Sequence, residues 1–142
     1  MSQVADQEES TTIHTLTQQV VACLYDKKAS DIVVFDVEGQ TSYCDRLVLC
    51  TGTSGRQVRA LAEHVVAMVK QAGSRPLGTE GLSSGRWVLV DLGAVVVHIF
   101  DEESRTHYDL DGMWADAPCM SRAELGLPDD PVPSSEMAPF MD

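Results

Sequence analysis

The fold of this chain is decided by the stretch RWVLVDLGAVVVHIF, residues 86–100, its most apolar and β-branched segment. Two six-residue runs, 87–92 and 95–100, flank the dipeptide Gly93-Ala94. Glycine at the first central position of a two-residue loop favours a type II′ turn, so the stretch predicts a tight β-hairpin. One face of this hairpin would be wholly aliphatic, with Leu92 opposite Val95, Val90 opposite Val97 and Val88 opposite Ile99.

The other face of the predicted hairpin is chemically more varied. It would pair Trp87 with Phe100, Leu89 with His98 and Asp91 with Val96. Trp87 is either an exposed anchor for a partner or a residue buried under a helix, and the sequence leaves both open. Asp91, a diagonal neighbour of His98, either orients the imidazole or caps a nearby backbone group.

Length and composition limit the class of protein. A chain of 142 residues is long enough for one domain with its own core. Its formal charge of −12 opposes binding to nucleic acid phosphates and favours a basic partner. The four cysteines show no CxxC spacing, and the acidic start resembles neither a signal nor a transit peptide. No apolar run is long enough to span a membrane, so we expect a soluble cytoplasmic protein.

Periodicity and turn signals predict the remaining elements. Ahead of the hairpin they predict a helix over 11–28, strands at 31–37 and 45–50, a helix over 54–72 and a short strand within 76–81. After the hairpin they predict a turn at 101–104, a strand at 105–110 and a short helical segment at 111–117. The second helix is the best defined, because Ser54 and Gln57 form a capping box and Gly73 follows its end. This order predicts an α/β (α+β) fold, a single mixed β-sheet with helices packed on it.

The chain divides into three predicted parts. Residues 1–10 are expected to be a disordered acidic N-terminus, and residues 11–117 the folded domain. Residues 118–142 hold five of the six prolines among serines and acidic residues, which is typical of a disordered tail. Within that tail, Met137, Phe140 and Met141 form a candidate docking motif.

The turn at residues 52–55, Gly-Thr-Ser-Gly, is one candidate for chemistry. At a strand-to-helix junction such a turn either binds a phosphate or simply begins a well-capped helix. It matches neither the P-loop nor the full GxGxxG pattern. Asp31 and Asp36 fall on opposite faces of their strand, so no acidic pair for magnesium is found there.

His98, His107 and Asp91 are a second candidate, for a metal site or a hydrolytic dyad. Zinc needs three or four convergent ligands, and no serine or cysteine nucleophile accompanies the histidines. The sequence therefore predicts no catalytic residue, no cofactor and no metal.

Five motifs carry a resemblance to a known family. They are DRLVLCTGTSGRQV at 45–58, GTEG at 78–81, RWVLVDLG at 86–93, VH at 97–98 and RTHYDL at 105–110. In this order they are similar to the ribosomal silencing factor family (RsfS, Iojap-like), over residues 11–117. The resemblance implies a small fold similar to nucleotidyltransferases, without the catalytic acids and without known catalysis.

The resemblance also implies a function and a set of site residues. Family members bind the large ribosomal subunit through its fourteenth protein, block joining of the small subunit and lower translation when nutrients are short. Trp87, Asp91, Leu92 and Gly93 match the partner-binding surface, and further matching positions are Asp45, Glu80, Tyr108 and Leu110. Ala94 departs from the family pattern, which usually has an acidic residue there, so the hairpin tip lacks one contact for a basic partner.

Two other functions stay open at this point. One is a nucleotidyl- or phosphoryl-transfer enzyme that uses the turn at residues 52–55. The other is self-association into a homodimer through an exposed strand edge. Neither sequence-specific nucleic acid nor a membrane is an expected partner.

Overall fold

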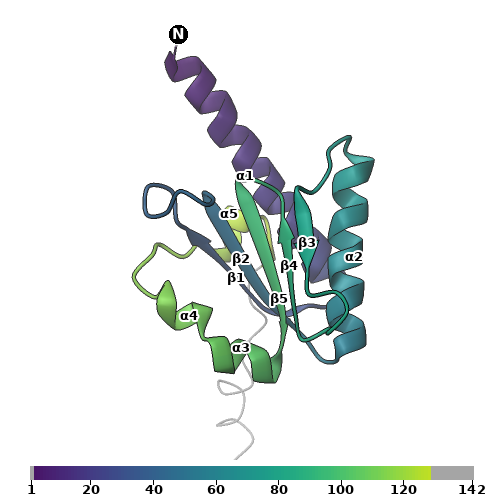
Figure 1. Ribbon diagram of the computed structural model, residues 1–142. Coiled ribbons are helices and arrows are strands. Elements are labelled where there is room, and N and C mark those ends of the chain that lie inside the picture. Colours follow the sequence, from purple (N-terminus) through teal and green to yellow (C-terminus); the bar gives the residue numbers. More distant parts are fainter. Residues whose placement is uncertain (1, 129–142) are drawn as a thin grey trace, which may run out of the picture.

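The computed structural model describes residues 2–128, with side chains described from Thr12 onward. Five strands form one sheet: β1 (Ser30–Asp36), β2 (Arg46–Gly52), β3 (Gly78–Glu80), β4 (Trp87–Asp91) and β5 (Val95–Asp101). Their order across the sheet is β1-β2-β5-β4-β3 (Figure 1). Strands β2 and β5 run parallel while all other neighbours are antiparallel, which confirms the predicted single mixed sheet.

The central hairpin has the predicted register. Trp87 lies opposite Phe100 and Asp91 opposite Val96, and the other expected pairs follow in step. Gly93 adopts a φ of +93°, which suits glycine at a tight turn, and Leu92 N donates to Val95 O at 2.9 Å. The turn chemistry and the alternation of residues 86–100 therefore determine this part of the sheet.

Two long helices, α1 (Ser2–Asp26) and α2 (Gly55–Gln71), cover one face of the sheet. The aliphatic face of the hairpin packs against them, and Val88, Val90, Val97 and Ile99 are fully buried there. Ser54 caps the start of α2, and its hydroxyl accepts from Gln57 N at 3.1 Å. Its buried residues repeat at helical spacing: Val58, Leu61, Ala62, Val65 and Val69. The main core lies between this helix pair and the sheet.

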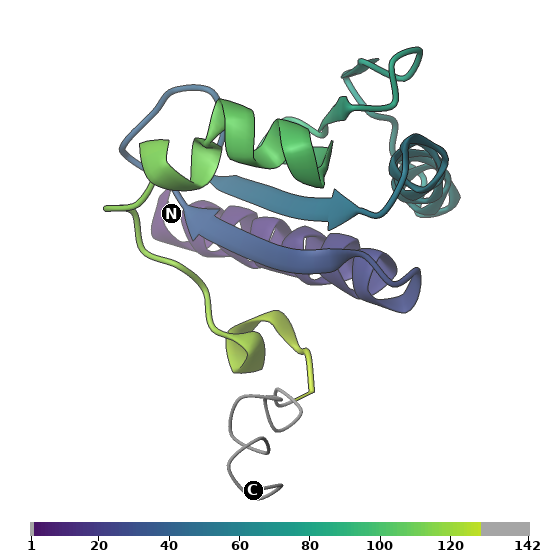
Figure 2. The same ribbon diagram turned by 90° about the horizontal axis from the view of Figure 1, so that it is seen from below.

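The opposite face of the sheet carries two short helices, α3 (Glu102–Tyr108) and α4 (Leu110–Met113). Figure 2 shows them on the side of the sheet away from α1. A second, smaller core forms beneath them from Phe35, Val37, Leu47, Leu49, Val96 and Phe100, among others. These short helices cover the face only in part, and this leaves room for a site.

The prediction of a strand at residues 105–110 is wrong, because residues 105–108 end α3 and Leu110 begins α4. Asp101 caps that helix by accepting from Ser104 N at 2.8 Å, and acidic residues in the first turn suit the helix dipole. Arg105 then fixes the helix by donating to both carboxylate oxygens of Asp111 and to Thr51 Oγ1. The expected turn at 101–104 is thus the start of a helix. The helical segment expected at 111–117 begins earlier, at Leu110, and ends at Met113.

The chain does not become irregular at residue 118, as the sequence had suggested. Asp36 N donates to Pro118 O at 2.8 Å and Met120 N donates to Val34 O at 2.9 Å, so this segment lines the outer edge of β1. A short helix α5 (Arg122–Leu125) follows, capped by Ser121. Leu125 and Leu127 are buried in the main core. The candidate docking motif at 137–141 lies outside the described residues.

The first helix also begins earlier than expected, at Ser2 instead of after Ser10. The first 26 residues contain neither proline nor glycine, so nothing in the sequence breaks a helix ahead of Ser10. Residues 2–10 are therefore helical in the structure, in place of the expected irregular N-terminus.

Candidate functional site

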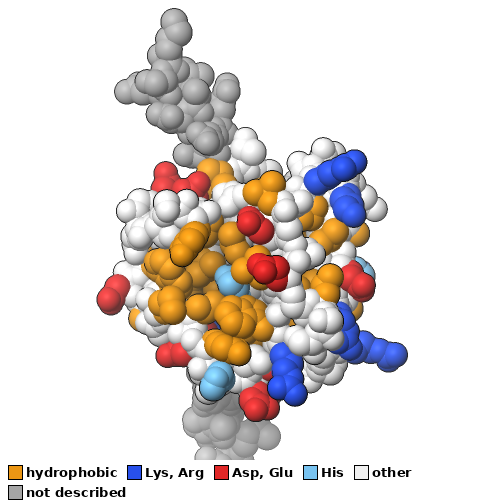
Figure 3. All heavy atoms as spheres, in the orientation of Figure 1, with side chains coloured by type: hydrophobic (Ala, Val, Ile, Leu, Met, Phe, Trp, Pro, Cys, Tyr) orange, Lys and Arg blue, Asp and Glu red, His pale blue; other side chains and the backbone are white. Residues whose placement is uncertain are grey.

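The face of the sheet opposite α1 and α2, which we call the open face, presents alternate residues of the hairpin. Trp87, Leu89 and Asp91 come from β4, and Val96, His98 and Phe100 from β5. In Figure 3, hydrophobic side chains gather over this face around one histidine. Acidic side chains lie at their margin, and Lys and Arg lie toward the α2 side.

An aromatic cluster forms one end of the open face. The Trp87 ring stacks on Phe100 with centroids 5.2 Å apart and an interplanar angle of 25°. The ring of Tyr108, from α3, lies 4.5 Å from Trp87 and is half exposed. Trp87 itself is partly buried, so it packs into the fold and still reaches the surface; its role as an anchor for a partner stays a prediction.

His98 is held inside this cluster as a neutral side chain. It is 8% exposed, and burial lowers the pKa of its imidazole to about 4. Its Nδ1 accepts a hydrogen bond of 2.9 Å from Trp87 Nε1, so the neutral ring carries its proton on Nε2. Such a histidine is a structural hydrogen-bond partner, as a residue at the middle of a central strand suggests.

Asp91 caps the hairpin turn and does not orient His98. Its Oδ1 accepts from Gly93 N at 2.9 Å, which is the second of the two roles expected for it. In the described part of the chain, no group of three or more His, Cys, Asp or Glu side chains could hold a metal ion.

A groove of about 360 Å³ lies next to the aromatic cluster on the open face. Its floor is the apolar surface of β5, β4 and β2, and one wall comes from α4 through Leu110, Met113 and Trp114. Tyr43, 83% exposed, and Met113, 67% exposed, place large apolar side chains at the surface. Glu80 and Asp91 line the groove as well, so it joins an apolar interior to carboxylates.

The predicted partner-binding residues do not all lie at this groove. Glu80, Asp91 and Leu110 line it, and Trp87 and Tyr108 lie in the adjoining aromatic cluster. Gly93 forms the hairpin turn. The side chain of Leu92 packs against the main core on the opposite face, because it alternates with Asp91 along the strand. Asp45 is partly buried, and its backbone bonds to Val37 and Ala94.

Sequence reasoning missed three side chains that shape the groove. Tyr43 comes from the loop before β2, and Met113 and Trp114 come from the end of α4. The spacing of Leu110, Met113 and Trp114 is that of one helix face, which was a usable signal. Nothing local in the sequence indicates that Tyr43 meets them.

The turn at residues 52–55 has a structural explanation. An added Cβ on Gly52 would lie 2.9 Å from Val58 Cγ2 and 3.1 Å from Val58 N, so only glycine lets α2 pack this closely. The expected capping box is modified, since the Gln57 side chain accepts from Thr53 N and not from Ser54 N. These contacts give the turn a packing role and lend no support to a phosphate site.

None of the helices in the part of the chain that the structure describes is long and apolar enough to cross a membrane.

Comparison with known proteins adds to this picture. The model of the family described as "Ribosomal silencing factor during starvation" (RsfS) matches residues 10–140, beyond the 11–117 that the motifs suggested. A Haemophilus influenzae protein named Ribosomal silencing factor RsfS is 44% identical over 88 residues, covering 62% of this chain and 86% of that protein. A Bacillus subtilis protein of the same name is 42% identical over 93 residues, covering 66% and 79%.

A more distant relative and a solved structure are also similar to this chain. A mouse protein named Mitochondrial assembly of ribosomal large subunit protein 1 is 33% identical over 98 residues, covering 67% of this chain and 43% of that protein. A crystal structure of a Chromobacterium violaceum protein superposes with a TM-score of 0.71 at 41% identity, covering 72% of this chain and 86% of that one. With a family model that matches most of its length and relatives this similar, the chain belongs to the ribosomal silencing factor (RsfS) family.

Proposed function

We propose that this protein is a non-enzymatic repressor of translation that binds the large ribosomal subunit through its fourteenth protein. Bound there, it obstructs joining of the small subunit and lowers translation under nutrient limitation, in the cytoplasm. The names of the relatives, ribosomal silencing factors and a protein of large-subunit assembly, support the ribosomal part of this proposal. The fourteenth protein, the steric block and the cytoplasmic location rest on the family resemblance.

The observation that carries the proposal is the composition of the open face. Exposed Tyr43 and Met113 line an apolar groove of about 360 Å³, and partly buried Trp87 lies in the aromatic cluster next to it. Large aromatic and methionine side chains are typical of the central residues of protein interfaces. An apolar side chain of a partner would fill the groove and remove these residues from water.

Charge supports a basic partner for the same face. Glu80 and Asp91 line the groove, within a chain of formal charge −12. Carboxylates beside an apolar site speed the encounter with a basic protein and favour one orientation of it. A steric block needs no chemistry at the site, so the neutral, hydrogen-bonded state of His98 suits this function.

A homodimer that uses an exposed strand edge stays a prediction alongside this proposal. Light scattering across a range of protein concentrations tests it, and binding to the ribosome does not depend on the outcome.

The test is co-sedimentation of the purified chain with isolated large subunits, isolated small subunits and joined ribosomes. We expect binding to large subunits alone, and loss of at least tenfold in affinity for Met113→Asp, which places a carboxylate at the groove. Ala22→Asp is the matched control, since it adds the same charge at an exposed position of α1 across the sheet. Equal effects of the two variants, or binding to small subunits in preference, would contradict the proposal.

A further inference from the structure

Positive charge is concentrated in one segment of this acidic chain. Residues 53–88 contain five of its ten Lys and Arg residues but only two of its 22 Asp and Glu residues. The local charge is therefore +3, in a chain of −12. The five cations are all exposed, and we call them the basic edge: Arg56, Arg59, Lys70, Arg75 and Arg86. In Figure 3 the Lys and Arg side chains lie toward the α2 side of the molecule.

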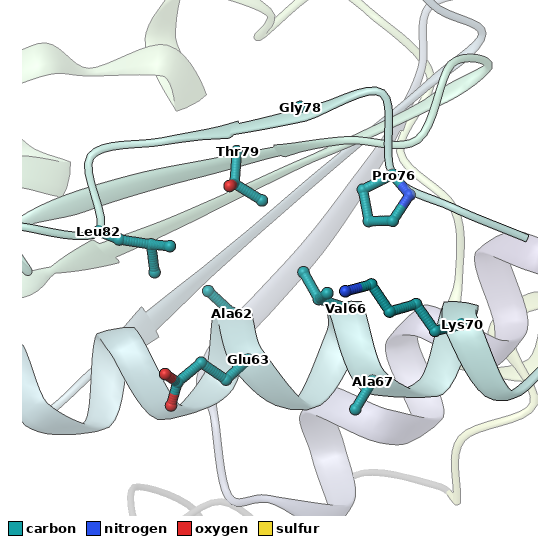
Figure 4. Close-up of a pocket in the computed structure, with 9 residues that line it drawn as sticks. All are labelled: Ala62, Glu63, Val66, Ala67, Lys70, Pro76, Gly78, Thr79 and Leu82. Carbon is teal, nitrogen blue, oxygen red and sulfur yellow. The ribbon is translucent and has the colours of Figure 1, made fainter.

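The fold assembles this edge from α2 and the segments on either side of β3. Arg56 and Arg59 lie in the first turns of α2, and the Arg59 guanidinium lies directly over Gly85, next to Arg86 in the chain. Lys70 lies in the last turn, where it lines a groove of about 420 Å³ between α2 and β3 and reaches toward Pro76 (Figure 4). Seventeen helical residues span about 25 Å, so the edge is long enough to meet several phosphates of one strand.

The cations of the basic edge have no carboxylate partner among the described residues. By contrast, Arg46 pairs with Asp36 at 3.1 Å and Arg105 pairs with Asp111 at 2.9 Å. An unpaired exposed cation keeps its full charge for an external anion, whereas a paired one must first lose its carboxylate. The protein is rich in acids, yet these five positions carry charge that the described fold does not neutralise.

The composition of the edge points to a phosphate backbone as that anion. Residues 55–86 contain no Phe, Trp or Tyr, so bases would find no stacking surface there. Arginine and lysine side chains that act without aromatic residues bind phosphates. Such contacts orient a protein on a nucleic acid but carry no sequence preference. The charge argument against nucleic acid applies to the chain as a whole and does not apply to this edge.

We propose that the basic edge binds the phosphate backbone of large-subunit RNA while the open face binds its protein partner. This inference rests on the proposed function and adds a second contact to it. Figure 3 shows the hydrophobic open face and the cations of the α2 side in one view, so both surfaces can face the same subunit. Two linked contacts bind more tightly than either alone, because the second forms within an already bound complex.

The test compares two double charge reversals of equal size. Arg56→Glu with Lys70→Glu alters both ends of the basic edge and leaves Arg59, which packs over Gly85, in place. The control, Lys27→Glu with Lys28→Glu, makes the same charge change at exposed lysines after α1. Melting curves of both variants establish that they are folded. Binding is measured to whole large subunits and to the purified fourteenth protein, from 50 to about 200 mM salt.

We expect the edge variant to lose about tenfold in affinity for large subunits and to keep its affinity for the purified protein within twofold. Loss of two phosphate contacts should also make the slope of log affinity against log salt less negative by about 1.5. The control variant should change neither the affinity for large subunits nor the affinity for the purified protein by more than about threefold.

Three results would overturn the inference. Equal losses in the two variants would mean that only net charge matters. Equal losses for subunits and for the purified protein would assign the edge to a protein interface. Tighter binding by the edge variant would mean that the edge holds an acidic protein segment. Failure of the unmodified chain to bind large subunits is a different result, which defeats the proposed function itself.

Discussion

Trp87 Nε1 donates a hydrogen bond of 2.9 Å to Nδ1 of His98, and this contact ties the candidate binding face to the interior of the sheet. The same tryptophan stacks on Phe100 and meets the exposed ring of Tyr108. A residue in this position serves stability and binding at once. Experiments on the open face must therefore separate the two.

Trp87→Phe and Tyr108→Ala make that separation. Trp87→Phe keeps a ring over Phe100 but leaves His98 Nδ1, in a buried ring, without its donor, so unfolding free energy should fall by about 1–2 kcal/mol. Tyr108→Ala removes a half-exposed ring and should cost about 1 kcal/mol or less, yet weaken large-subunit binding severalfold. Urea denaturation and co-sedimentation measure the two effects. Unchanged binding by Tyr108→Ala would remove the aromatic cluster from the interface.

The buried histidine predicts a pH dependence of stability. The pKa of His98 is about 4 in the folded chain and about 6.5 unfolded, so the unfolded state binds more protons between these values. Stability should therefore fall as pH drops from 6.5 toward 4, by up to about 3 kcal/mol. His98→Asn cannot titrate and can still accept from Trp87, so its stability should depend less on pH. Denaturation midpoints from pH 7 to pH 5 test this, and parallel curves for the two chains would contradict it.

Substitution of Gly52 by alanine tests the packing role of the turn at 52–55, and the same substitution at Gly78 is the matched control. An added methyl group at Gly52 meets Val58 at 2.9 Å, whereas at Gly78 it meets nothing within 4 Å. Gly52→Ala should lower unfolding free energy by about 1–3 kcal/mol, and Gly78→Ala should change it by less than about 1 kcal/mol.

The same turn allows a test of the enzyme alternative. Nucleotide with magnesium should leave the melting temperature of the unmodified chain unchanged, because a ligand raises it only by binding the folded state. A clear shift that Gly52→Ala abolishes would revive a transfer enzyme built on this turn.

The segment after residue 117 should be required for stability. Its two buried leucines, Leu125 and Leu127, each contribute about 1.5–3 kcal/mol of hydrophobic stabilisation. A chain ended after residue 117 should therefore be less stable than a chain ended after residue 128, by at least about 3 kcal/mol. The urea denaturation midpoints of these two shortened chains and of the full chain test this prediction. Equal stability of the shortest and the full chain would mean that the segment does not pack against the core.

The hairpin and α2 could be predicted because their signals are local. Gly93 at a two-residue turn, strict alternation on either side and a Ser54 cap each determine structure within a few residues. The same alternation also placed Trp87 and Asp91 on the same face of the sheet.

Helix α3 could not be predicted by the same reasoning. Asp101 does act as a cap, but the arginine that secures the helix reaches Thr51 and the carbonyl of Asp31, far away in sequence. Alternating residues at 105–110 resemble a strand when those contacts are unknown. Tertiary contacts outweighed the local pattern here.

The segment at 118–128 did carry a local signal that composition obscured. Ser121 and Glu124 form a capping box, a common mark of a helix start, within a region whose prolines suggested disorder. The groove was hidden for another reason. Tyr43 and Met113 line the same groove only because the fold brings the loop before β2 and the end of α4 together.

The strip at 118–120, described above as hydrogen-bonded to β1, has a consequence for the solution behaviour of the protein. An open strand edge is a template on which further chains can add and aggregate. At the β1 edge of this sheet, Asp36 N already donates to Pro118 O, and Val34 O already accepts from Met120 N. These backbone groups are therefore not available to pair with another chain. Within the described residues, the edge left uncovered is β3, which is three residues long and ends at Glu80. A short edge with a charged residue resists fibre-like growth, and removal of the strip should expose the longer one.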